Sequence, residues 1–431
     1  MSDEKFDAII VGGGLAGCSA AIVLARAGLE VLLIERGDYC GAKNMTGGRL
    51  YGHSLEKIIP GFAEEAPIER VVKREKVSLL TPDGGLDIGY SSGKLSAGPE
   101  CASYTVLRAK FDQWMAEKAE EAGAEVAAGF LVDALLVEDG KVVGISAAGE
   151  EMYADVVILA DGVNSLLAQQ IGMKKELEPH QVAVGAKETI KLSEDVINQR
   201  FGLASGEGTA WLSAGDPTAG GFGGGFLYTN KDTISIGVVA TLGDIGHSDV
   251  SVPQMLERFK SHPSIAPYLE GGEIIEYSGH LVPEEGIHMV PELVRDGVLV
   301  TGDAAGLCVN LGFTVRGMDF AVESGRLAAE AVIKAHELGD FSAAVLSSYQ
   351  QALEYSFVMR DLKSFKGFPT LLSRRAIFEC LPELCGEIAD KIFTVDGAPS
   401  ENIVLYIVDA IARRTSASAL MQQITPVLEA F

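Results

Sequence analysis

Short apolar runs separated by glycine turns organise the first part of the chain. Residues 7–11 (DAIIV) form an apolar run that is typical of a buried parallel strand. The segment from Leu15 to Ala27 predicts a helix, which Gly28 ends, and a second strand is expected over 30–35. This order of strand, turn, helix and strand predicts an α/β unit with a parallel sheet.

The same pattern of a buried strand followed by a turn returns twice further along the chain. Residues 153–160 (YADVVILA) end in Asp161-Gly162, and residues 297–301 lead to a turn before a helix that is expected to end near Leu338. The α/β unit is therefore discontinuous and resumes after insertions.

The segments between these strands carry other patterns. A helix over 109–122, a strand over 125–132 and a hairpin over 133–146 are expected after the first insertion. Residues 181–290 alternate apolar and polar positions, for example in DTISIGVVA, which predicts an antiparallel sheet. Residues 341–431 are expected to be mostly helical. Helix breaks are expected at Gly367-Phe368-Pro369, Pro382 and Gly397-Ala398-Pro399.

Composition narrows the classes of function. The chain has 431 residues, of which 47% are hydrophobic, enough for two or three domains with large cores. Its net charge of −25 argues against a nucleic-acid partner and against electrostatic adhesion to anionic lipid. No apolar run approaches the roughly 18 residues of a spanning helix. The acidic start MSDEKFD lacks the apolar core of a signal peptide, so we expect a cytoplasmic protein with reduced thiols.

Candidate chemistry first appears at the turn between the first strand and the first helix. Gly12, Gly14 and Gly17 give the spacing G-x-G-x-x-G. The first glycine permits the sharp turn, the second leaves room for a pyrophosphate, and the third lets the helix approach the sheet. Glu35 ends the second strand about 20 residues later, where an acid binds ribose hydroxyls. A turn without a ligand is the alternative, which the fitting strand, helix and acid disfavour.

Three segments in chain order resemble the FAD-binding fold of the glutathione-reductase and para-hydroxybenzoate-hydroxylase group. They are the glycine turn with Glu35, the segment Ala160-Asp161-Gly162, and Thr301-Gly302-Asp303 before a helix. The resemblance implies that Asp303 binds the ribityl and pyrophosphate part of FAD and that Arg108 touches the cofactor. A helix N-cap is the alternative role for Asp303.

Longer blocks are similar to the FixC family of flavoproteins, over roughly residues 1–395. They include NMTGGRLYGHSLEKIIPGF, TVLRAKFDQWMAEKAEEAGAEV, GGGFLYTNKDTISIGVV and GDAAGLCVNLGFTVRGMDFAVESGRLAAE. The resemblance implies non-covalent FAD that takes electrons from electron-transfer flavoprotein subunits and passes them to a membrane quinone. It also implies a subunit of a FixABCX-type, electron-bifurcating complex, in the cytoplasm or peripheral on the inner face of the cell membrane.

The cysteines bear on metal content. The similar electron-transfer-flavoprotein:ubiquinone oxidoreductases carry a [4Fe–4S] cluster on C-terminal cysteines, and such a cluster needs four thiolates. Only Cys380 and Cys385 occur in that part of this chain, so no metal site is expected here. The resemblance implies that a separate ferredoxin-like FixX subunit holds the cluster.

Two other classes of function stay open. FAD-dependent reductases or hydroxylases of a small or prenyl substrate, such as geranylgeranyl reductases, share the FAD motifs, and a flavin-bearing scaffold without activity is the other alternative. The glycine cluster at 220–225 is followed by a strand and not by a helix, so no second dinucleotide site is expected. This favours delivery of electrons by a protein and not by NADH directly.

The motifs and the resemblance give a set of expected cofactor contacts. The turns Gly47-Gly48 and Gly312-Phe313 are expected to flank the flavin ring, with N–H groups near Gly312 stabilising negative charge on it. His53, His280 and His288 are candidate proton carriers, with ordinary core or surface histidines as the alternative. The expected cofactor-binding residues are Gly12, Gly14, Leu15, Ala16, Gly17, Glu35, Arg36, Gly47, Gly48, Arg108, Val132, Asp161, Gly162, Asp303, Gly312 and Phe313.

The expected fold class is α/β: a Rossmann-like FAD-binding domain with an inserted antiparallel-sheet substrate domain and a helical C-terminal region. The expected ranges are 1–60, 101–180 and 291–340 for the FAD-binding domain, 61–100 and 181–290 for the quinone or substrate domain, and 341–431 for the C-terminal region.

The C-terminal region is expected to contact a partner or the membrane. Within 375–393, apolar residues recur at helix-like spacing, interrupted at Pro382, and packing against the protein's own core is the alternative. These residues are Ile377, Phe378, Leu381, Leu384, Ile388 and Ile392.

Overall fold

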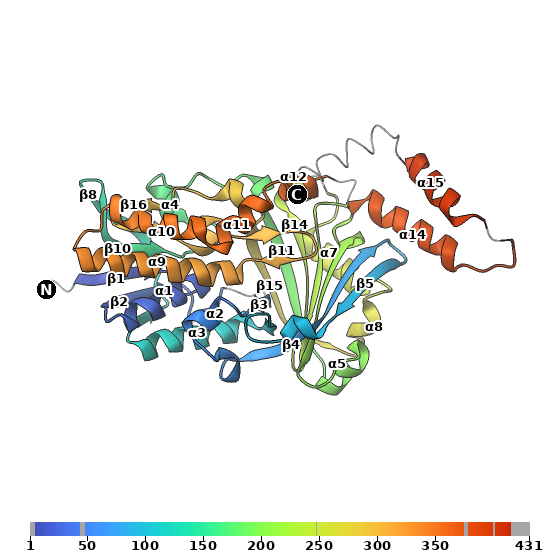
Figure 1. Cartoon of the computed structure of the whole chain (residues 1–431), viewed down its shortest axis with the longest axis horizontal. Coiled ribbons are helices and arrows are strands. Elements are labelled where there is room, and N and C mark those ends of the chain that lie inside the picture. Colours follow the sequence, from blue (N-terminus) through green and yellow to red (C-terminus); the bar gives the residue numbers. More distant parts are fainter. Residues whose placement is uncertain (1–4, 44–47, 247, 375–377, 400, 415–431) are drawn as a thin grey trace.

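Two large β-sheets form the framework of the protein (Figure 1). The computed structural model describes all residues except 1–4, 44–47, 247, 375–377, 400 and 415–431. One end of the elongated molecule holds an eight-stranded sheet with its helices, and a nine-stranded sheet follows it. The predicted α/β fold class, with a helical C-terminal region, is confirmed.

The eight-stranded sheet has a parallel centre in the order β17-β10-β1-β2-β7. Its central strands are runs of fully buried apolar residues; Ile10, for example, lies opposite Leu33 on one side and Ile158 on the other. Burial on both faces explains why these strands do not alternate apolar and polar positions. The strands are β1 (Lys5–Val11), β2 (Val31–Glu35), β7 (Glu125–Ala128), β8 (Val132–Glu138), β9 (Lys141–Ala147), β10 (Glu150–Leu159), β16 (Val294–Arg295) and β17 (Val298–Val300).

The single strand expected over 125–132 is two strands, which corrects that prediction. Gly129 has a φ of +87° between β7 and β8 and turns the chain out of the parallel sheet. From there β8 and β9 form the predicted hairpin, which β9 attaches to β10.

The helices of this unit pack closely against one another. α1 (Leu15–Arg26) contacts both α3 (Arg108–Ala122) and α9 (Met318–Leu338), and α10 (Ala343–Tyr355) packs on α9. A Cβ on Gly325 would lie 2.2 Å from the carbonyl oxygen of Ala16. The glycine therefore lets the backbone of α9 approach the first turn of α1 closely, next to the glycine turn.

The nine-stranded sheet has the order β15-β11-β14-β13-β12-β4-β6-β3, with β5 paired to β4. Neighbouring strands are antiparallel, as predicted, except β12 and β4, which run parallel. Trp211, Ile236 and Phe259 lie in a second core between this sheet and its helices. The strands are β3 (Gly48–Tyr51), β4 (Ile68–Leu80), β5 (Gly85–Ser91), β6 (Ser103–Val106), β11 (Val182–Lys191), β12 (Glu207–Gly215), β13 (Gly223–Thr229), β14 (Thr233–Thr241) and β15 (Glu273–Pro283). The helices of this part are α5 (Glu194–Phe201), α6 (Leu242–Ile245), α7 (Val252–Ser261) and α8 (Ala266–Leu269).

β3 and β6 connect the two parts of the protein. Both strands pair within the nine-stranded sheet, although the expected ranges assigned residues 1–60 and 101–180 to the FAD-binding unit. β3 also contacts α9 of the first unit. These two strands therefore lie at the junction of the two units, and the division into domains stays a proposal.

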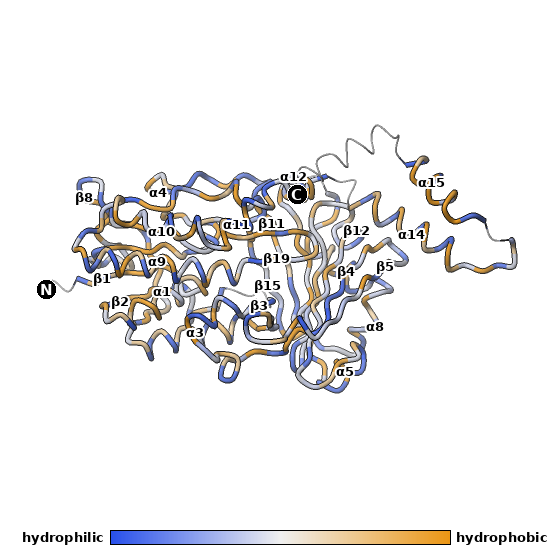
Figure 2. Tube along the Cα trace, viewed as in Figure 1, coloured by the Kyte–Doolittle hydropathy of each residue, from blue (hydrophilic) through white to orange (hydrophobic). Residues whose placement is uncertain are grey.

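The C-terminal region ends in a helical hairpin that projects from the body (Figure 1). α11 (Phe357–Ser364) and α12 (Phe368–Leu372) precede the hairpin of α14 (Cys380–Phe393) and α15 (Ile403–Arg414), and Figure 2 shows apolar stretches along both arms. None of the helices among the described residues combines the length and apolarity needed to cross a membrane.

The structure decides two expectations for residues 375–393. Pro382 does not interrupt the helix but lies in its first turn, where a proline removes no helical hydrogen bond. Phe378 is buried, with its ring 5.7 Å from that of Phe222, so this residue packs on the protein's own core. Ile377 lies outside the described residues. The exposed apolar surface begins with Leu381 and continues to Ile392 and Phe393.

Candidate functional site

The glycine turn connects the end of β1 to α1, as its spacing predicts. Gly12 has a φ of +107°, and a Cβ there would lie 2.3 Å from the carbonyl oxygen of Ala160 at the end of β10. A Cβ on Gly17 would lie 2.0 Å from the carbonyl oxygen of Gly12. Side chains at either position would push the strand ends and the helix apart.

The start of α1 is suited to an anion. Gly14 is its N-cap and offers no side-chain hydrogen bond, and the first turn, which begins with Leu15 and Ala16, contains no acidic residue. The N–H groups of this turn and the positive end of the helix dipole therefore lack a competing carboxylate. This chemistry fits the pyrophosphate of a dinucleotide.

Glu35 closes the turn from the end of β2. Its buried carboxylate accepts the N–H of Gly13 at 2.8 Å and the N–H of Gly37 at 2.6 Å. A carboxylate has about four lone-pair sites, so these two bonds leave acceptors for ribose hydroxyls. The next residue, Arg36, is exposed. Glu35 thus stands at the position at which the spacing predicts a ribose-binding acid.

Charged side chains converge beyond the carboxyl ends of the parallel strands. Arg108, at the start of α3, forms two hydrogen bonds of 2.7 Å with Asp112. Burial raises the pKa of the Asp303 carboxyl, and the nearby charges of His280, Arg108 and Lys174 partly oppose this shift. Arg108 and Asp303, which are both expected to contact the cofactor, therefore lie close enough for their charges to interact although they are far apart in the sequence.

Lys174 and Asp161 extend this cluster, and the sequence motifs gave no sign of Lys174. Its Nζ donates hydrogen bonds to the carbonyl oxygens of Val163 at 2.6 Å and Ala304 at 2.9 Å. Burial lowers the pKa of Lys174 to about 8, although Asp161 and Asp303 favour its charged form. Asp161 accepts a hydrogen bond of 2.8 Å from Ser165 Oγ. Lys174 therefore connects, through two hydrogen bonds, the turn after β10 with the turn that carries Asp303.

The remaining expected contacts are spread over several elements. Gly162 has a φ of +81° after β10, and Val132 is buried at the start of β8. Gly48 is the first residue of β3, whereas Gly47 lies outside the described residues.

The turn with Gly312 and Phe313 belongs to a short hairpin of β18 (Val309–Asn310) and β19 (Val315–Arg316). Gly312 has a φ of +77°, and its N–H donates a hydrogen bond of 2.9 Å to Oδ1 of Asn310. N–H groups for a flavin would therefore have to come from elsewhere in the turn. The side chain of Phe313 is 53% exposed, so it is available to cover a flat ligand.

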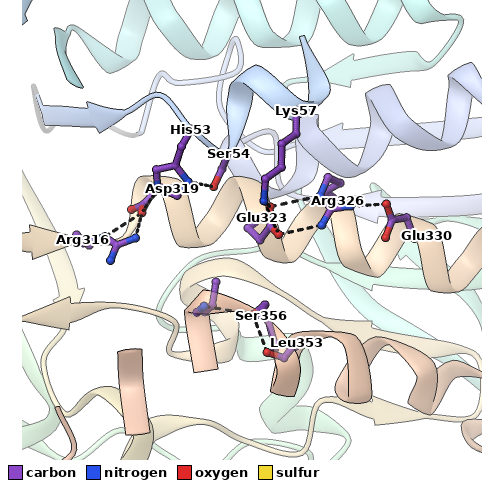
Figure 3. A network of polar contacts seen from close by, with 11 residues as sticks. His53, Ser54, Lys57, Arg316, Asp319, Glu323, Arg326, Glu330, Leu353 and Ser356 are labelled. Atoms are coloured by element: carbon purple, nitrogen blue, oxygen red, sulfur yellow. Dashed lines mark hydrogen bonds and ion pairs between the residues drawn. The ribbon is translucent and has the colours of Figure 1, made fainter. Parts of the chain in front are cut away.

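A polar network joins α9 to the segment after β3 (Figure 3). Nε2 of His53 lies 3.1 Å from Oδ2 of the buried Asp319, and Nε of Arg316 lies 2.9 Å from the same oxygen. One turn further along α9, Lys57 and Arg326 contact Glu323. The network fixes α9 against the residues that follow β3.

The three candidate histidines differ in their surroundings. His53 belongs to the network just described, and His280 lies near Asp303, where burial lowers the pKa of its imidazole. His288 is exposed, with Nε2 3.2 Å from the carbonyl oxygen of Lys366. Sequence analysis did not identify Asp319 as the partner of His53, because no pattern in the sequence indicates that these two distant residues are in contact.

Comparison with known proteins bears on this site. The family model of FAD-dependent oxidoreductases matches residues 7–170, which hold the glycine turn, Glu35 and Arg108. The family model described as ETF-QO, ubiquinone-binding, matches residues 183–282 of the nine-stranded sheet.

Curated relatives match along nearly the whole chain. A probable electron transfer flavoprotein-quinone oxidoreductase, YdiS of Escherichia coli K12, is 54% identical over 94% of both chains. The chain belongs to the FixC family. Protein FixC of Salmonella typhi is 54% identical over 92% of both chains, and Protein FixC of Azorhizobium caulinodans is 40% identical over 93% of this chain and 92% of the relative. The predicted family is thereby confirmed, and this FixC-family protein is an FAD-dependent oxidoreductase.

Solved structures share the fold at lower identity. A geranylgeranyl bacteriochlorophyll reductase-like protein of Thermoplasma acidophilum has a TM-score of 0.74 at 22% identity, covering 99% of this chain and all of that chain. A myxobacterial chondrochloren halogenase has a TM-score of 0.63 at 20% identity, covering 85% of this chain and 83% of its own. These likenesses concern the fold alone.

Proposed function

We propose that this protein takes electrons from an electron-transfer flavoprotein and passes them, through bound FAD, to a membrane quinone. The observation that carries the proposal is the match of residues 183–282 to the ubiquinone-binding family model, beside an FAD-type site in residues 7–170. We also infer that the protein works as a subunit of a FixABCX-type, electron-bifurcating complex.

The residues of the site have separable roles toward the flavin. The first turn of α1 would hold the pyrophosphate, Glu35 the ribose, and Asp303 with Arg108 the ribityl and pyrophosphate part. When bound, FAD supplies the ability to accept electrons singly or in pairs. The chain supplies position and electrostatics: the positive charges of Arg108 and Lys174 offset part of the cost of burying the Asp303 carboxylate.

A narrow hollow beside the Gly312 turn is lined by groups whose chemistry fits a quinone head group, and it would have to widen to admit the ring. Arg49, Tyr51, Tyr228 and Phe313 contribute to its lining. The Arg49 guanidinium lies over the Tyr51 ring, 4.5 Å from its centroid, and two of its nitrogens contact Glu75. Aromatic faces and fixed N–H donors match a flat ring with two carbonyl acceptors. Burial raises the pKa of both tyrosines, so their hydroxyl groups remain donors at neutral pH.

We infer that a protein, and not NADH directly, delivers the electrons, because the glycine-rich segment at 220–225 does not fit a second dinucleotide site. The glycine-rich segment at 220–225 leads into β13 and offers no helix N-terminus to a second dinucleotide. Electrons from NADH would therefore enter through the flavin of a partner.

The projecting hairpin is the surface we assign to partner docking or to peripheral membrane contact at the inner face of the cell membrane. Glu387 of α14 accepts a hydrogen bond of 2.9 Å from the Tyr406 hydroxyl and pairs with Arg413 at 2.7 Å, which clamps the two helices together. Phe393 and Val404 are largely exposed near the tip. A ferredoxin-like subunit carrying the [4Fe–4S] cluster is the partner we expect there, because only Cys380 and Cys385 occur in this part of the sequence and such a cluster needs four thiolates.

Quinone reduction in vesicles tests the proposal. The protein, electron-transfer flavoprotein and NADH are mixed with lipid vesicles containing a quinone, and quinol is measured. We expect quinol only when both proteins are present. If the flavin-loaded protein gives no quinol but reduces a prenyl substrate supplied in the same vesicles, the proposal fails in favour of a prenyl reductase.

A further inference from the structure

Two adjacent glutamates after β15 have opposite surroundings. Glu284 is 7% exposed, and its backbone N–H donates to the carbonyl oxygen of Gln181 at 2.9 Å. Glu285 instead lies toward the surface, where one carboxylate oxygen is 3.2 Å from His180 Nε2. No lysine or arginine forms an ion pair with Glu284 in the described part of the chain. A buried carboxylate without a cation is costly, so its presence calls for a function.

The Glu284 side chain is connected to the Gly312 turn through one amide. Oε2 of Glu284 accepts a hydrogen bond of 3.1 Å from Nδ2 of Asn310, while Oδ1 of Asn310 accepts the N–H of Gly312 at 2.9 Å. A backbone N–H can only donate, so Oδ1 must face Gly312 and Nδ2 must face Glu284. The amide therefore has one orientation, and Glu284 must offer it an acceptor.

The protonation state of Glu284 changes the strength of its hydrogen bond with Asn310. Burial raises the pKa of Glu284 to about 7, and the Asn310 hydrogen bond only partly opposes that shift. An ionised carboxylate accepts a hydrogen bond about twice as strong as a neutral acceptor does. The turn that carries Phe313 is thus held by a group whose charge responds to its surroundings near neutral pH.

The other titratable groups nearest Glu284 are a buried thiol and the His180–Glu285 pair. Cys308, just before β18, lies close enough to feel Glu284, Asp303 and Asp319, and burial raises the pKa of its thiol well above the usual value. The thiol therefore stays protonated. His180 and Glu285 pair with each other on the more exposed side of the segment.

We propose that Glu284 is a positioning residue for the flavin, which sets the Gly312 turn through Asn310 and takes up one proton when the flavin site gains negative charge. Two electrons would pass from the reduced electron-transfer flavoprotein to the FAD, and one proton from solvent, in addition to any that the flavin itself binds, would bind a Glu284 carboxylate oxygen. The proton returns to solvent when the electrons leave to the acceptor. The inference rests on the proposed function only in placing the flavin ring beside this turn.

The test is the pH dependence of the midpoint potential of the bound FAD. One additional proton per two electrons is a tenfold change in the equilibrium constant per pH unit, about 30 mV for a two-electron couple. We expect the potential of the parent protein to fall more steeply with pH around neutrality than that of Glu284→Gln, which keeps an acceptor for Asn310 but cannot titrate. Glu285→Gln is the matched control and should keep the parent slope. Equal slopes in the parent and Glu284→Gln would overturn the inference.

A second measurement needs no variant. Infrared difference spectra of the reduced minus the oxidised parent protein should show a protonated-carboxyl band that shifts in D₂O. The absence of such a band would contradict the inference, even if Glu284→Gln does not fold. Both measurements use a chemical reductant with redox mediators, so they stand apart from the partner assay. If the parent and Glu284→Gln differ in slope as expected but no quinol forms, the proposed function alone is refuted. If quinol forms but the two slopes are equal, this inference alone is refuted.

Discussion

The carboxylate of Glu35 accepts the backbone N–H of Gly13 at 2.8 Å, so the acid at the end of β2 is part of the glycine turn at the end of β1. The same carboxylate accepts the N–H of Gly37 at 2.6 Å. One side chain thus holds the turn in shape from two sides before any ribose is present.

Glu35→Gln should weaken FAD binding without unfolding the protein. An amide has one oxygen, so its NH₂ group would face one of the two N–H donors and leave it unsatisfied, which costs about 1–3 kcal/mol. We expect flavin affinity to fall roughly fivefold to a hundredfold, measured by titrating apoprotein with FAD. Glu30→Gln, at an exposed position, is the control and should bind FAD as the parent does.

Gly14→Val should yield folded protein that is mostly without flavin. A branched side chain at the N-cap of α1 would occupy the place where the spacing predicts the pyrophosphate. Flavin per polypeptide is read from absorbance after purification, and folding from circular dichroism. Gly98→Ala is the control, because nothing lies within 4 Å of a Cβ there. Full flavin occupancy in Gly14→Val would show that the site is elsewhere.

Lys174 should make stability depend on pH in the alkaline range. Its pKa is about 8 in the folded protein, below the value of about 10 in an unfolded chain. Between these values the unfolded state binds the additional proton, so the free energy of unfolding rises with pH. Relative to Lys174→Met, the parent should gain stability from about pH 8 to about pH 10. Denaturant unfolding at several pH values measures the difference, and a flat difference would contradict the assignment.

Charges at the tip of the hairpin should abolish docking but not folding. Phe393 and Val404 are 79% and 64% exposed, so changing both to Asp removes little packing. We expect this double variant to keep its flavin but to lose co-purification with the small iron–sulfur partner or turnover with quinone in vesicles. Tyr355→Asp, at a residue 76% exposed near the end of α10, is the control. Retention of both activities by the double variant would exclude the hairpin as a docking surface.

A charge at the buried Phe378 of the same region should, in contrast, destabilise the fold. Phe378→Asp would place a charge against Phe222 inside the core, so we expect a large loss of stability. A melting temperature equal to that of the parent would contradict the packing described for Phe378.

Local pattern was sufficient to place the turn from Gly12 to Gly17, Glu35 and most strands, because the positions of these elements are set by neighbours in the sequence. Contacts between distant segments were not accessible in this way. His53 and Asp319 are 266 residues apart, and no sequence motif next to either residue indicates contact with the other. The parallel pairing of β12 with β4, which brings β3 and β6 into the second sheet, is equally non-local.

The sequence also did not predict which single residues are buried. The spacing of apolar residues over 375–393 predicts an apolar face but does not decide between a partner and the protein's own core, and only the structure shows that the body of the protein covers Phe378. Glycines give the same lesson: Gly325 lies in a regular helix pattern, and only the crossing of α9 with α1 explains why a side chain is excluded.

The most direct test of the electron route is the rate at which the flavin of the isolated, FAD-loaded protein loses its absorbance under anaerobic rapid mixing. We predict that NADH alone reduces the flavin slowly or not at all, and that adding the two electron-transfer flavoprotein subunits with NADH makes reduction fast. Rapid reduction by NADH alone, unchanged by those subunits, would contradict the account.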